Sequence, residues 1–236
     1  MPHSLFIADL HLSAEQPDIT AAFRRFVTTH APHAESVYIL GDLFEYWAGD
    51  DDLADPFHVE IIAALRTIPQ LFVMRGNRDL LLGAAFAKAA GATLLPDPTL
   101  IDLYGTPTLL SHGDMLCTDD HAYQQFRTQV HQADFQQSFL AQPLTERKAW
   151  ITQLRQRSQH EKQSKTSAIM DVNLVAVADL LRQYAYPRLI QGHTHRPDCH
   201  IHHVDSHPCT RWVLADWHAQ GSMLRCDEAG CRVLPC

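Results

Sequence analysis

The chain has 236 residues, of which 46% are hydrophobic, so it is long and apolar enough to bury one large core. Its net charge of −8 argues against broad nucleic-acid binding, which needs a basic face that displaces counterions from phosphate. No stretch approaches the ~20 apolar residues of a membrane-spanning helix, and the start lacks the features of a signal peptide, so we expect a cytosolic protein whose membrane contact is peripheral.

The first half of the chain alternates predicted strands with predicted helices. Short apolar runs at Leu5–Ala8, Val37–Leu40 and Leu71–Met74 have the length of buried strands. Between them, Ile19–Thr29 and Phe57–Arg66 carry apolar residues at helical spacing. This β-α-β-α-β order predicts parallel strands joined by right-handed crossovers.

Two further strands are expected at Thr108–Ser111 and Arg188–Gln191, with a largely helical segment between them. This segment covers about residues 119–186 and repeatedly places apolar residues at helical spacing. We expect a single domain over residues 1–236, in which this insertion forms a cap over the active site. The alternative is that its apolar faces only pack on each other and on the sheet.

The C-terminal part contains short β-rich runs that predict an antiparallel closing sheet. The runs are His200–Val204, Arg211–Ala215, Ser222–Arg225 and Cys231–Leu234. The six cysteines form no C-x-x-C pair, and a cytosolic location favours free thiols over disulfides. A zinc module between Cys199 and Cys236 is an alternative, but the Cys and His spacing there is irregular.

Polar side chains follow five of the predicted strands, at the point where each strand ends. They are Asp9 and His11, Asp42, Asn77, His112, and His193 with His195. Because the carboxyl ends of parallel strands meet at one edge of a sheet, we expect these side chains to lie together. Asp9 with His11, or Asp42 alone, is explained by a turn residue or a buried histidine, whereas two imidazoles at alternating positions, His193 and His195, are awkward for a core and natural for a pair of metals. Together, four imidazoles, two carboxylates and a carboxamide predict a phosphoester hydrolase with two divalent metals that share one carboxylate.

In this order the blocks resemble the calcineurin-like metallophosphoesterase superfamily, whose pattern is D-x-H, G-D, G-N-x-D/E, a single His and G-H-x-H. The resemblance implies a mixed α/β fold, a four-layer αββα sandwich of two mixed sheets with a helical insertion as a lid. It also implies two metal sites, one formed by Asp9, His11, Asp42 and His195, the other by Asp42, Asn77, His112 and His193.

Longer motifs resemble the UDP-2,3-diacylglucosamine diphosphatase family of Gram-negative lipid A synthesis. They are ADLHLS at 8–13, GDLFEYW at 41–47, GNRD at 76–79, SHGD at 111–114, AIMDVN at 168–173 and GHTHRP at 192–197. That family cleaves the substrate pyrophosphate by water attack on the uridine-side phosphorus, giving UMP and 2,3-diacylglucosamine 1-phosphate (lipid X). The resemblance implies two Mn²⁺ per chain, which would supply hydroxide from a bridging water. It also implies a lipid substrate met at the cytoplasmic face of the inner membrane; the charge argues against nucleic acid, and no protein partner is inferred.

The same resemblance implies which residues contact the substrate. They are Asn77, Arg78, Asp120, Ser158, Lys162, Lys165 and His193, with Lys162 standing where Asn is frequent in the family. Arg78 would stabilise phosphoryl charge as a fixed cation, beside Asn77 and His112 as further catalytic residues. Basic residues near Arg157 and Lys165 would hold the sugar phosphate, and a groove for the acyl chains would be lined by the apolar side chains Phe126, Phe135, Phe139 and Trp150.

The insertion also has other interpretations. The basic run with the apolar faces would suit docking on an anionic membrane leaflet, although such a run is also typical of a solvated helix face.

Two other functions remain open at this point. A metallophosphoesterase of the same fold could act on another nucleotide diphosphate ester or on a phosphoprotein, because a fold does not fix a substrate. An inactive metallophosphoesterase scaffold is more remote, because such a protein would have lost metal-binding residues and all seven are present here.

Overall fold

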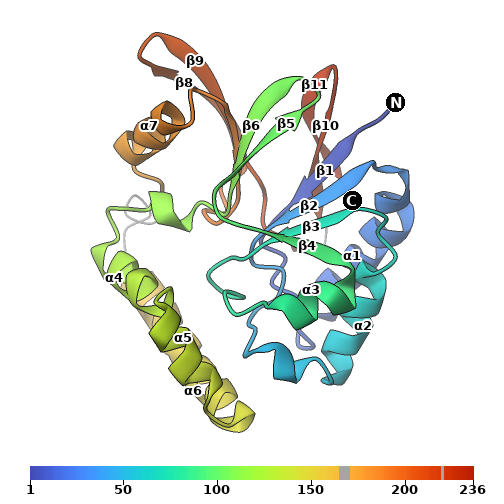
Figure 1. Cartoon of the computed structure of the whole chain (residues 1–236), viewed down its shortest axis with the longest axis vertical. Coiled ribbons are helices and arrows are strands. Elements are labelled where there is room, and N and C mark those ends of the chain that lie inside the picture. Colours follow the sequence, from blue (N-terminus) through green and yellow to red (C-terminus); the bar gives the residue numbers. More distant parts are fainter. Residues whose placement is uncertain (165–170, 219–220) are drawn as a thin grey trace.

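Two β-sheets form the centre of the computed structural model, which describes residues 1–164, 171–218 and 221–236, without the side chains of 157–164 (Figure 1). The six-stranded sheet has the order β11-β10-β1-β2-β3-β4, and the five-stranded sheet the order β5-β6-β7-β9-β8. Both sheets mix parallel with antiparallel pairs, as the family resemblance implied.

The first sheet contains the strands of the predicted β-α-β-α-β unit. Its strands are β1 (Ser4–Ile7), β2 (Ser36–Leu40), β3 (Leu71–Met74), β4 (Ala92–Leu95), β10 (Ser222–Asp227) and β11 (Gly230–Pro235). The helices on its outer face are α1 (Pro17–Thr29), α2 (Pro56–Leu65) and α3 (Ala84–Ala90), and short 3-10 turns occur at η1 (Ala31–His33) and η2 (Asp50–Asp52). Strands β1 to β4 run parallel, and the sequence patterns had not indicated α3 or β4.

The remaining helices are inserted in the chain between two strands of the second sheet. Its strands are β5 (Thr99–Leu103), β6 (Thr106–Ser111), β7 (Arg188–Gln191), β8 (Asp198–Val204) and β9 (His207–Val213). Between β6 and β7 lie η3 (Asp114–Leu116), α4 (His121–Val130), α5 (Ala133–Leu140), α6 (Leu144–Ser164) and α7 (Leu174–Gln183). Figure 1 shows α4 to α6 as an arm beside the first sheet's helices, with α7 next to β8 and β9.

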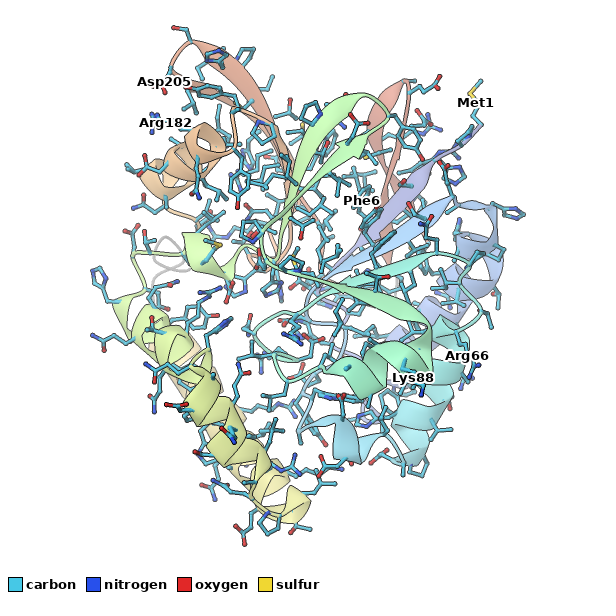
Figure 2. All side chains as sticks on the ribbon, in the orientation of Figure 1. Met1, Phe6, Arg66, Lys88, Arg182 and Asp205 are labelled. Atoms are coloured by element: carbon cyan, nitrogen blue, oxygen red, sulfur yellow. A yellow bond between two sulfur atoms is a disulfide. The ribbon has the colours of Figure 1, made fainter. Side chains whose placement is uncertain are left out.

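Three apolar clusters hold these layers together. The inter-sheet cluster includes Phe6 and Leu40 from the first sheet and Leu110 and Ile190 from the second. A larger cluster packs the helices α1 to α3 on the first sheet, and a third packs α7 on the second. The ion pair between Arg182 Nε and Asp205 Oδ2 (2.6 Å), labelled in Figure 2, also joins α7 to the β8–β9 turn. The result is the expected αββα sandwich.

The beginning of α6 is tied to the loop that contains η2. Arg147 is only 1% exposed, and its guanidinium donates to the carbonyl of Ala48 and to Asp51 Oδ1 (3.0 Å). Beside it, Lys148 Nζ lies 2.7 Å from Asp52 Oδ1. Burying an arginine costs free energy that satisfied donors offset, so these contacts fix where α6 starts relative to the first sheet.

The expectation of one C-terminal antiparallel sheet is wrong. The β8–β9 hairpin joins the second sheet, where β9 runs parallel to β7, and the β10–β11 hairpin joins the first sheet beside β1. Alternating polar and apolar residues predict a strand but not the sheet to which it belongs, because both sheets bury one face in the same core.

The expectation of free thiols is wrong for one pair of cysteines. Cys226 and Cys231 form a disulfide, since the β10–β11 register places them opposite each other with Cα atoms 4.1 Å apart. The other four cysteines are thiols. In the described part of the chain, no Cys and His group in this tail is close enough to hold a metal, which argues against the zinc module.

Candidate functional site

The seven predicted side chains converge where strands from both sheets end. Asp9 and His11 follow β1, Asp42 follows β2 and Asn77 follows β3, whereas His112 follows β6 and His193 and His195 follow β7. Five of the seven have left-handed backbone conformations, with φ of 54° at Asp9, 50° at His11, 52° at Asp42, 69° at His193 and 54° at His195. Non-glycine residues rarely adopt such angles, and they concentrate at functional sites.

Two glycines let these loops approach one another. A Cβ on Gly76 would overlap the backbone and carboxylate of Asp42, and one on Gly192 would overlap the carboxylate of Asp9. The G-N and G-H motifs therefore need glycine because each loop packs directly on a carboxylate of another loop.

Asp79 of the GNRD motif joins the loops after β2 and β3 by accepting hydrogen bonds from both. It is fully buried, its Oδ1 accepts from the Gly76 N–H (2.8 Å), and its Oδ2 accepts from the Leu43 N–H (2.8 Å). Burial, followed by the nearby charge of Asp42, raises the pKa of Asp79 to about 6. The sequence analysis gave Asp79 no role.

The Asp79→Asn variant is expected to lose about 1–3 kcal/mol of stability, because its amide nitrogen would face an N–H donor and leave it without an acceptor. Chemical denaturation of the metal-free protein measures this. Asp102→Asn is the matched control, since Asp102 also accepts a backbone N–H (Gly105, 2.8 Å), but in an exposed turn. Equal losses in the two variants would contradict a special role of Asp79.

The first group able to hold a metal consists of Asp9, His11 and His195. Nε2 of His11 lies 3.4 Å from Nε2 of His195, which in turn lies 3.5 Å from Asp9 Oδ1. Asp9 Oδ1 is buried and has no hydrogen-bond partner among the described residues. Nδ1 of His195 faces Asp216 Oδ2 at 3.2 Å, a carboxylate–histidine pairing that orients metal-binding histidines. Asp216 directly follows the predicted strand Arg211–Ala215, but it was missed because that strand was assigned to a separate closing sheet.

The second group consists of Asp9, Asp42 and His112, with Asn77 beside it. His112 Nδ1 lies 3.0 Å from the carbonyl of Leu40, so Nδ1 carries a proton, and the neutral ring would present the lone pair of Nε2 to a metal. That Nε2 faces Asn77 Oδ1 at 3.0 Å and Asp42 Oδ1 at 3.8 Å. In the metal-free protein a proton on Nε2 can satisfy the two oxygens, and a divalent metal would take the place of that proton, so these residues fit such an ion.

The pKa of His112 also indicates that the carboxylates around it favour a positive charge at this position. Burial alone would lower it, but the charges of Asp42, Asp9 and Asp114 outweigh burial and raise the pKa to about 9. His193, whose ring centroid lies 5.0 Å from that of His112, instead has its pKa lowered to about 4 by burial and by the charge on His112. A neutral imidazole is the form that binds metals.

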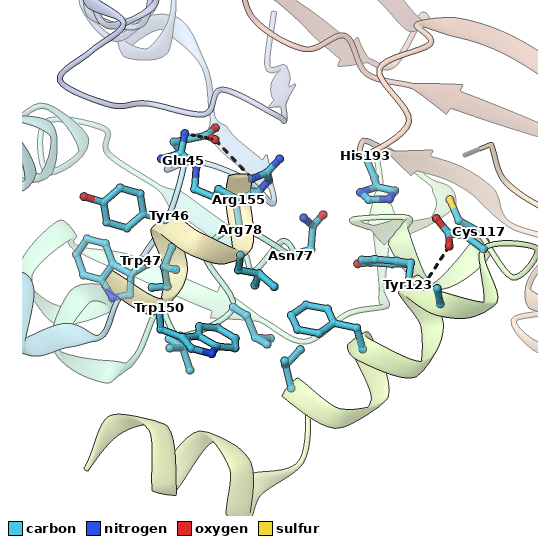
Figure 3. A pocket seen from close by; sticks show the side chains of 18 of the residues that line it. Glu45, Tyr46, Trp47, Asn77, Arg78, Cys117, Tyr123, Trp150, Arg155 and His193 are labelled. Atoms are coloured by element: carbon cyan, nitrogen blue, oxygen red, sulfur yellow. Dashed lines mark hydrogen bonds and ion pairs between the residues drawn. The ribbon is translucent and has the colours of Figure 1, made fainter. Parts of the chain in front are cut away.

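A cavity of about 620 Å³ opens next to these groups (Figure 3). Its polar end contains Asn77, Arg78 and His193, and its other end is built from apolar side chains of α4, α5 and α6. All four apolar residues predicted for the acyl chains line it: Phe126, Phe135, Phe139 and Trp150. Phe139 and Trp150 contact each other edge to face, with ring centroids 5.2 Å apart.

Glu45 holds the cations at the polar end of this cavity. Its Oε1 lies 3.5 Å from Arg78 Nη1 and 2.7 Å from Arg155 Nη2, and its Oε2 lies 3.2 Å from His11 Nδ1. Burial opposes ionisation, but the bond from His11 and the two arginines lower the pKa of Glu45 to about 2. The sequence analysis assigned Glu45 no ligand role, and the structure gives it the separate role of orienting Arg78.

Of the remaining predicted substrate contacts, the structure describes the side chain of Asp120 alone. Asp120 lines the cavity and also caps α4 by accepting from the Tyr123 N–H (3.1 Å). The side chains of Ser158 and Lys162, on the α6 backbone, and the whole of Lys165 lie outside the described residues. Tyr123, which sequence reasoning missed, stacks on His193 and donates to Asp114 Oδ2 (2.6 Å), so it connects α4 to the site.

Known proteins are similar in sequence to this chain over almost its whole length. The model of the calcineurin-like phosphoesterase family matches residues 3–197. A protein of Aromatoleum aromaticum named UDP-2,3-diacylglucosamine hydrolase is 52% identical, with 96% of this chain and 94% of that protein covered. Proteins of the same name from Serratia proteamaculans (94% of both chains covered) and Xanthomonas axonopodis pv. citri (96% of both) are each 48% identical.

Proposed function

The chain belongs to the calcineurin-like phosphoesterase family, and within it we propose that the protein hydrolyses the pyrophosphate of UDP-2,3-diacylglucosamine to UMP and 2,3-diacylglucosamine 1-phosphate in lipid A synthesis. The name of the similar relatives supports this substrate. The observation that carries the proposal is a single cavity that joins the polar site to an apolar chamber. A substrate with a diphosphate at one end and acyl chains at the other needs both.

We propose two divalent cations, Mn²⁺ in the cell, held by the seven residues that converge at the strand ends. They are Asp9, His11, Asp42 and His195 for one ion and Asp42, Asn77, His112 and His193 for the other. When bound, such ions supply Lewis-acid stabilisation of phosphoryl oxygens and make the attacking water more acidic.

The protein's own side chains position the substrate around that centre. Arg78 presents a permanent guanidinium charge, held by Glu45, toward the phosphoryl oxygens, where negative charge develops during the reaction. Asn77 lies beside Arg78 in the cavity and contacts His112. The apolar chamber keeps bulk water from the acylated sugar. A phosphate leaving group needs little help from a general acid, so a fixed cation suffices.

The point of attack is testable directly. Hydrolysis in ¹⁸O-labelled water is expected to place the label in UMP, since the proposal has water attacking the uridine-side phosphorus. Label in the lipid phosphate would contradict that direction of attack.

We further propose that α4, α5 and α6 are a cap within a single domain and that their apolar chamber binds the acyl chains. Trp150→Ala is expected to raise KM for the diacylated substrate about tenfold, because it removes much of an aromatic wall from the chamber. It should leave the hydrolysis of a short soluble phosphodiester unchanged. Val175→Ala, which truncates an exposed apolar side chain of α7 outside the chamber (68% exposed, against 38% for Trp150), serves as the control. An unchanged KM in Trp150→Ala would contradict the chamber's role.

Peripheral binding to the anionic cytoplasmic leaflet is part of the same proposal. Among the described residues no helix is long and apolar enough to cross a membrane. Leu140 and Trp150, on α5 and α6, are 42% and 38% exposed, and both lie on helices of the cap. Amphipathic surfaces of this kind bind at the lipid headgroup level. Failure to sediment with anionic vesicles at low salt would contradict membrane binding without affecting the proposed reaction.

The two alternative functions would need different structural features. A metallophosphoesterase for soluble nucleotide esters or phosphoproteins has no need of the apolar chamber, and comparable kcat/KM for unacylated UDP-sugars would favour it. An inactive scaffold has no need of seven converging candidate metal-binding side chains, five of which stand on a strained backbone.

A further inference from the structure

A second, polar cavity of about 300 Å³ lies on the β8–β9 side of the loop that carries His193 and His195. Thr194 and Arg196, in that loop, line this cavity and the large one as well. The two cavities therefore meet at a wall that is adjacent in sequence to two metal-binding histidines. This volume suits a nucleoside and is too small for two acyl chains.

Arg211 of β9 faces this second cavity with most of its donors unused. It is only 4% exposed, and its Nε donates to Nε2 of His202 (3.0 Å). In the described ranges no carboxylate lies within ion-pair distance of Arg211, and no acceptor bonds its Nη groups. Asp171 and Asp198 favour this charge from a distance, but the Nη donors themselves are satisfied only if a ligand accepts from them.

Thr194 offers a second unsatisfied group at the same place. Its Oγ1 is buried and has no hydrogen-bond partner among the described residues. Acceptors are also present: Asp171 pairs with Arg196 (Nη1 to Oδ2, 2.5 Å), and the Asp198 carboxylate stands at the rim, 67% exposed. Two arginines and two aspartates balance in charge, so the cavity suits a neutral ligand that carries both acceptors and donors rather than a free anion.

We infer that this cavity binds the uridine end of the substrate, with Arg211 and Thr194 donating to oxygens of the pyrimidine base or the ribose. The inference rests on the proposed function. A pyrophosphate held at Asp42 has two ends, and the acylated sugar occupies the apolar chamber. The polar cavity that shares Thr194 and Arg196 with the chamber is the place left for the nucleotide. Uracil carbonyls and ribose hydroxyls supply the acceptors that Arg211 lacks.

The Arg211→Met variant tests this assignment on the metal-loaded enzyme. The variant loses hydrogen bonds from a charged group, so KM for UDP-2,3-diacylglucosamine is expected to rise about tenfold or more. KM for a soluble phosphodiester that has no nucleoside should change little. Thr194→Val should show a smaller rise. Replacing an unpaired buried charge by a side chain of similar volume is compatible with folding, and the melting temperature checks this.

Inhibition separates base recognition from simple phosphate binding. UMP is expected to inhibit hydrolysis of the soluble ester at least tenfold more strongly than ribose 5-phosphate, and Arg211→Met should abolish that difference. Equal inhibition of the wild type by the two compounds, or an unchanged KM in Arg211→Met, would overturn the inference. If the wild-type protein fails to cleave the lipid, the proposed function fails, whereas the comparison of inhibitors still tests the cavity.

Discussion

Arg78→Ala is expected to lower turnover of the lipid substrate by ~10² or more while the metal content stays unchanged. The Arg78 guanidinium lies in the polar end of the cavity, where Glu45 Oε1 holds it at 3.5 Å. Its side chain is absent from both groups that could hold a metal, and only its backbone N–H bonds Asp42 Oδ1 (2.8 Å). Truncation therefore removes charge stabilisation from the transition state and leaves the metal-binding side chains in place.

Steady-state kinetics combined with elemental analysis of the purified variant measure this. Arg182→Ala is the matched control, because Arg182 forms its ion pairs on the surface of α7 and lines neither cavity. A variant of Arg78 that keeps full turnover would show that the metals alone stabilise the developing charge. Lost metal would point to a structural role instead.

Asp42→Asn is expected to lower turnover by ~10³ or more, since metal stabilisation of the transition state is worth several kcal/mol. The carboxylate faces both groups: Oδ2 lies 3.9 Å from His11 Nε2, and Oδ1 lies 3.8 Å from His112 Nε2. Asparagine keeps the shape and can still accept the Arg78 N–H, so the change removes mainly the shared charge.

Thermal unfolding gives a readout that is independent of activity. Mn²⁺ at a hundred times its Kd should stabilise the wild-type protein by ~2.7 kcal/mol, and this gain should be much smaller in Asp42→Asn. Asp179→Asn is the control, because Asp179 is an exposed partner of Arg182 on α7. Equal stabilisation of wild type and Asp42→Asn by Mn²⁺ would contradict a shared metal-binding role for Asp42.

The strand-end motifs were predictable because their cause is local. A buried apolar run followed by Gly and a polar residue, as at Gly41-Asp42 or Gly76-Asn77, needs no tertiary information to identify. The strands β1, β2, β3, β6 and β7 were also found within two residues at each end. The site was expected at the edge of one parallel sheet, yet His112, His193 and His195 come from the second sheet. Sequence periodicity carries no information on which sheet a strand joins.

Residues that act through long-range contacts escaped the sequence analysis for a physical reason. In the sequence Glu45 reads as a surface or helix-start residue, Asp216 directly follows a predicted strand, and Arg211 lies within one. Their roles come from what folding places beside them, namely Arg155 at Glu45, His195 at Asp216 and the second cavity at Arg211. The Cys226–Cys231 disulfide likewise follows from the hairpin register, which composition did not reveal.

The most direct test of the account is hydrolysis of UDP-2,3-diacylglucosamine by the purified protein, with and without Mn²⁺, beside Asn77→Ala and a short soluble phosphodiester. Asn77 Oδ1 faces His112 Nε2 at 3.0 Å, so its removal takes one ligand from the proposed second metal. We predict Mn²⁺-dependent release of UMP from the lipid that is lost in Asn77→Ala. Cleavage of the soluble ester alone, with the lipid untouched, would contradict the proposed substrate.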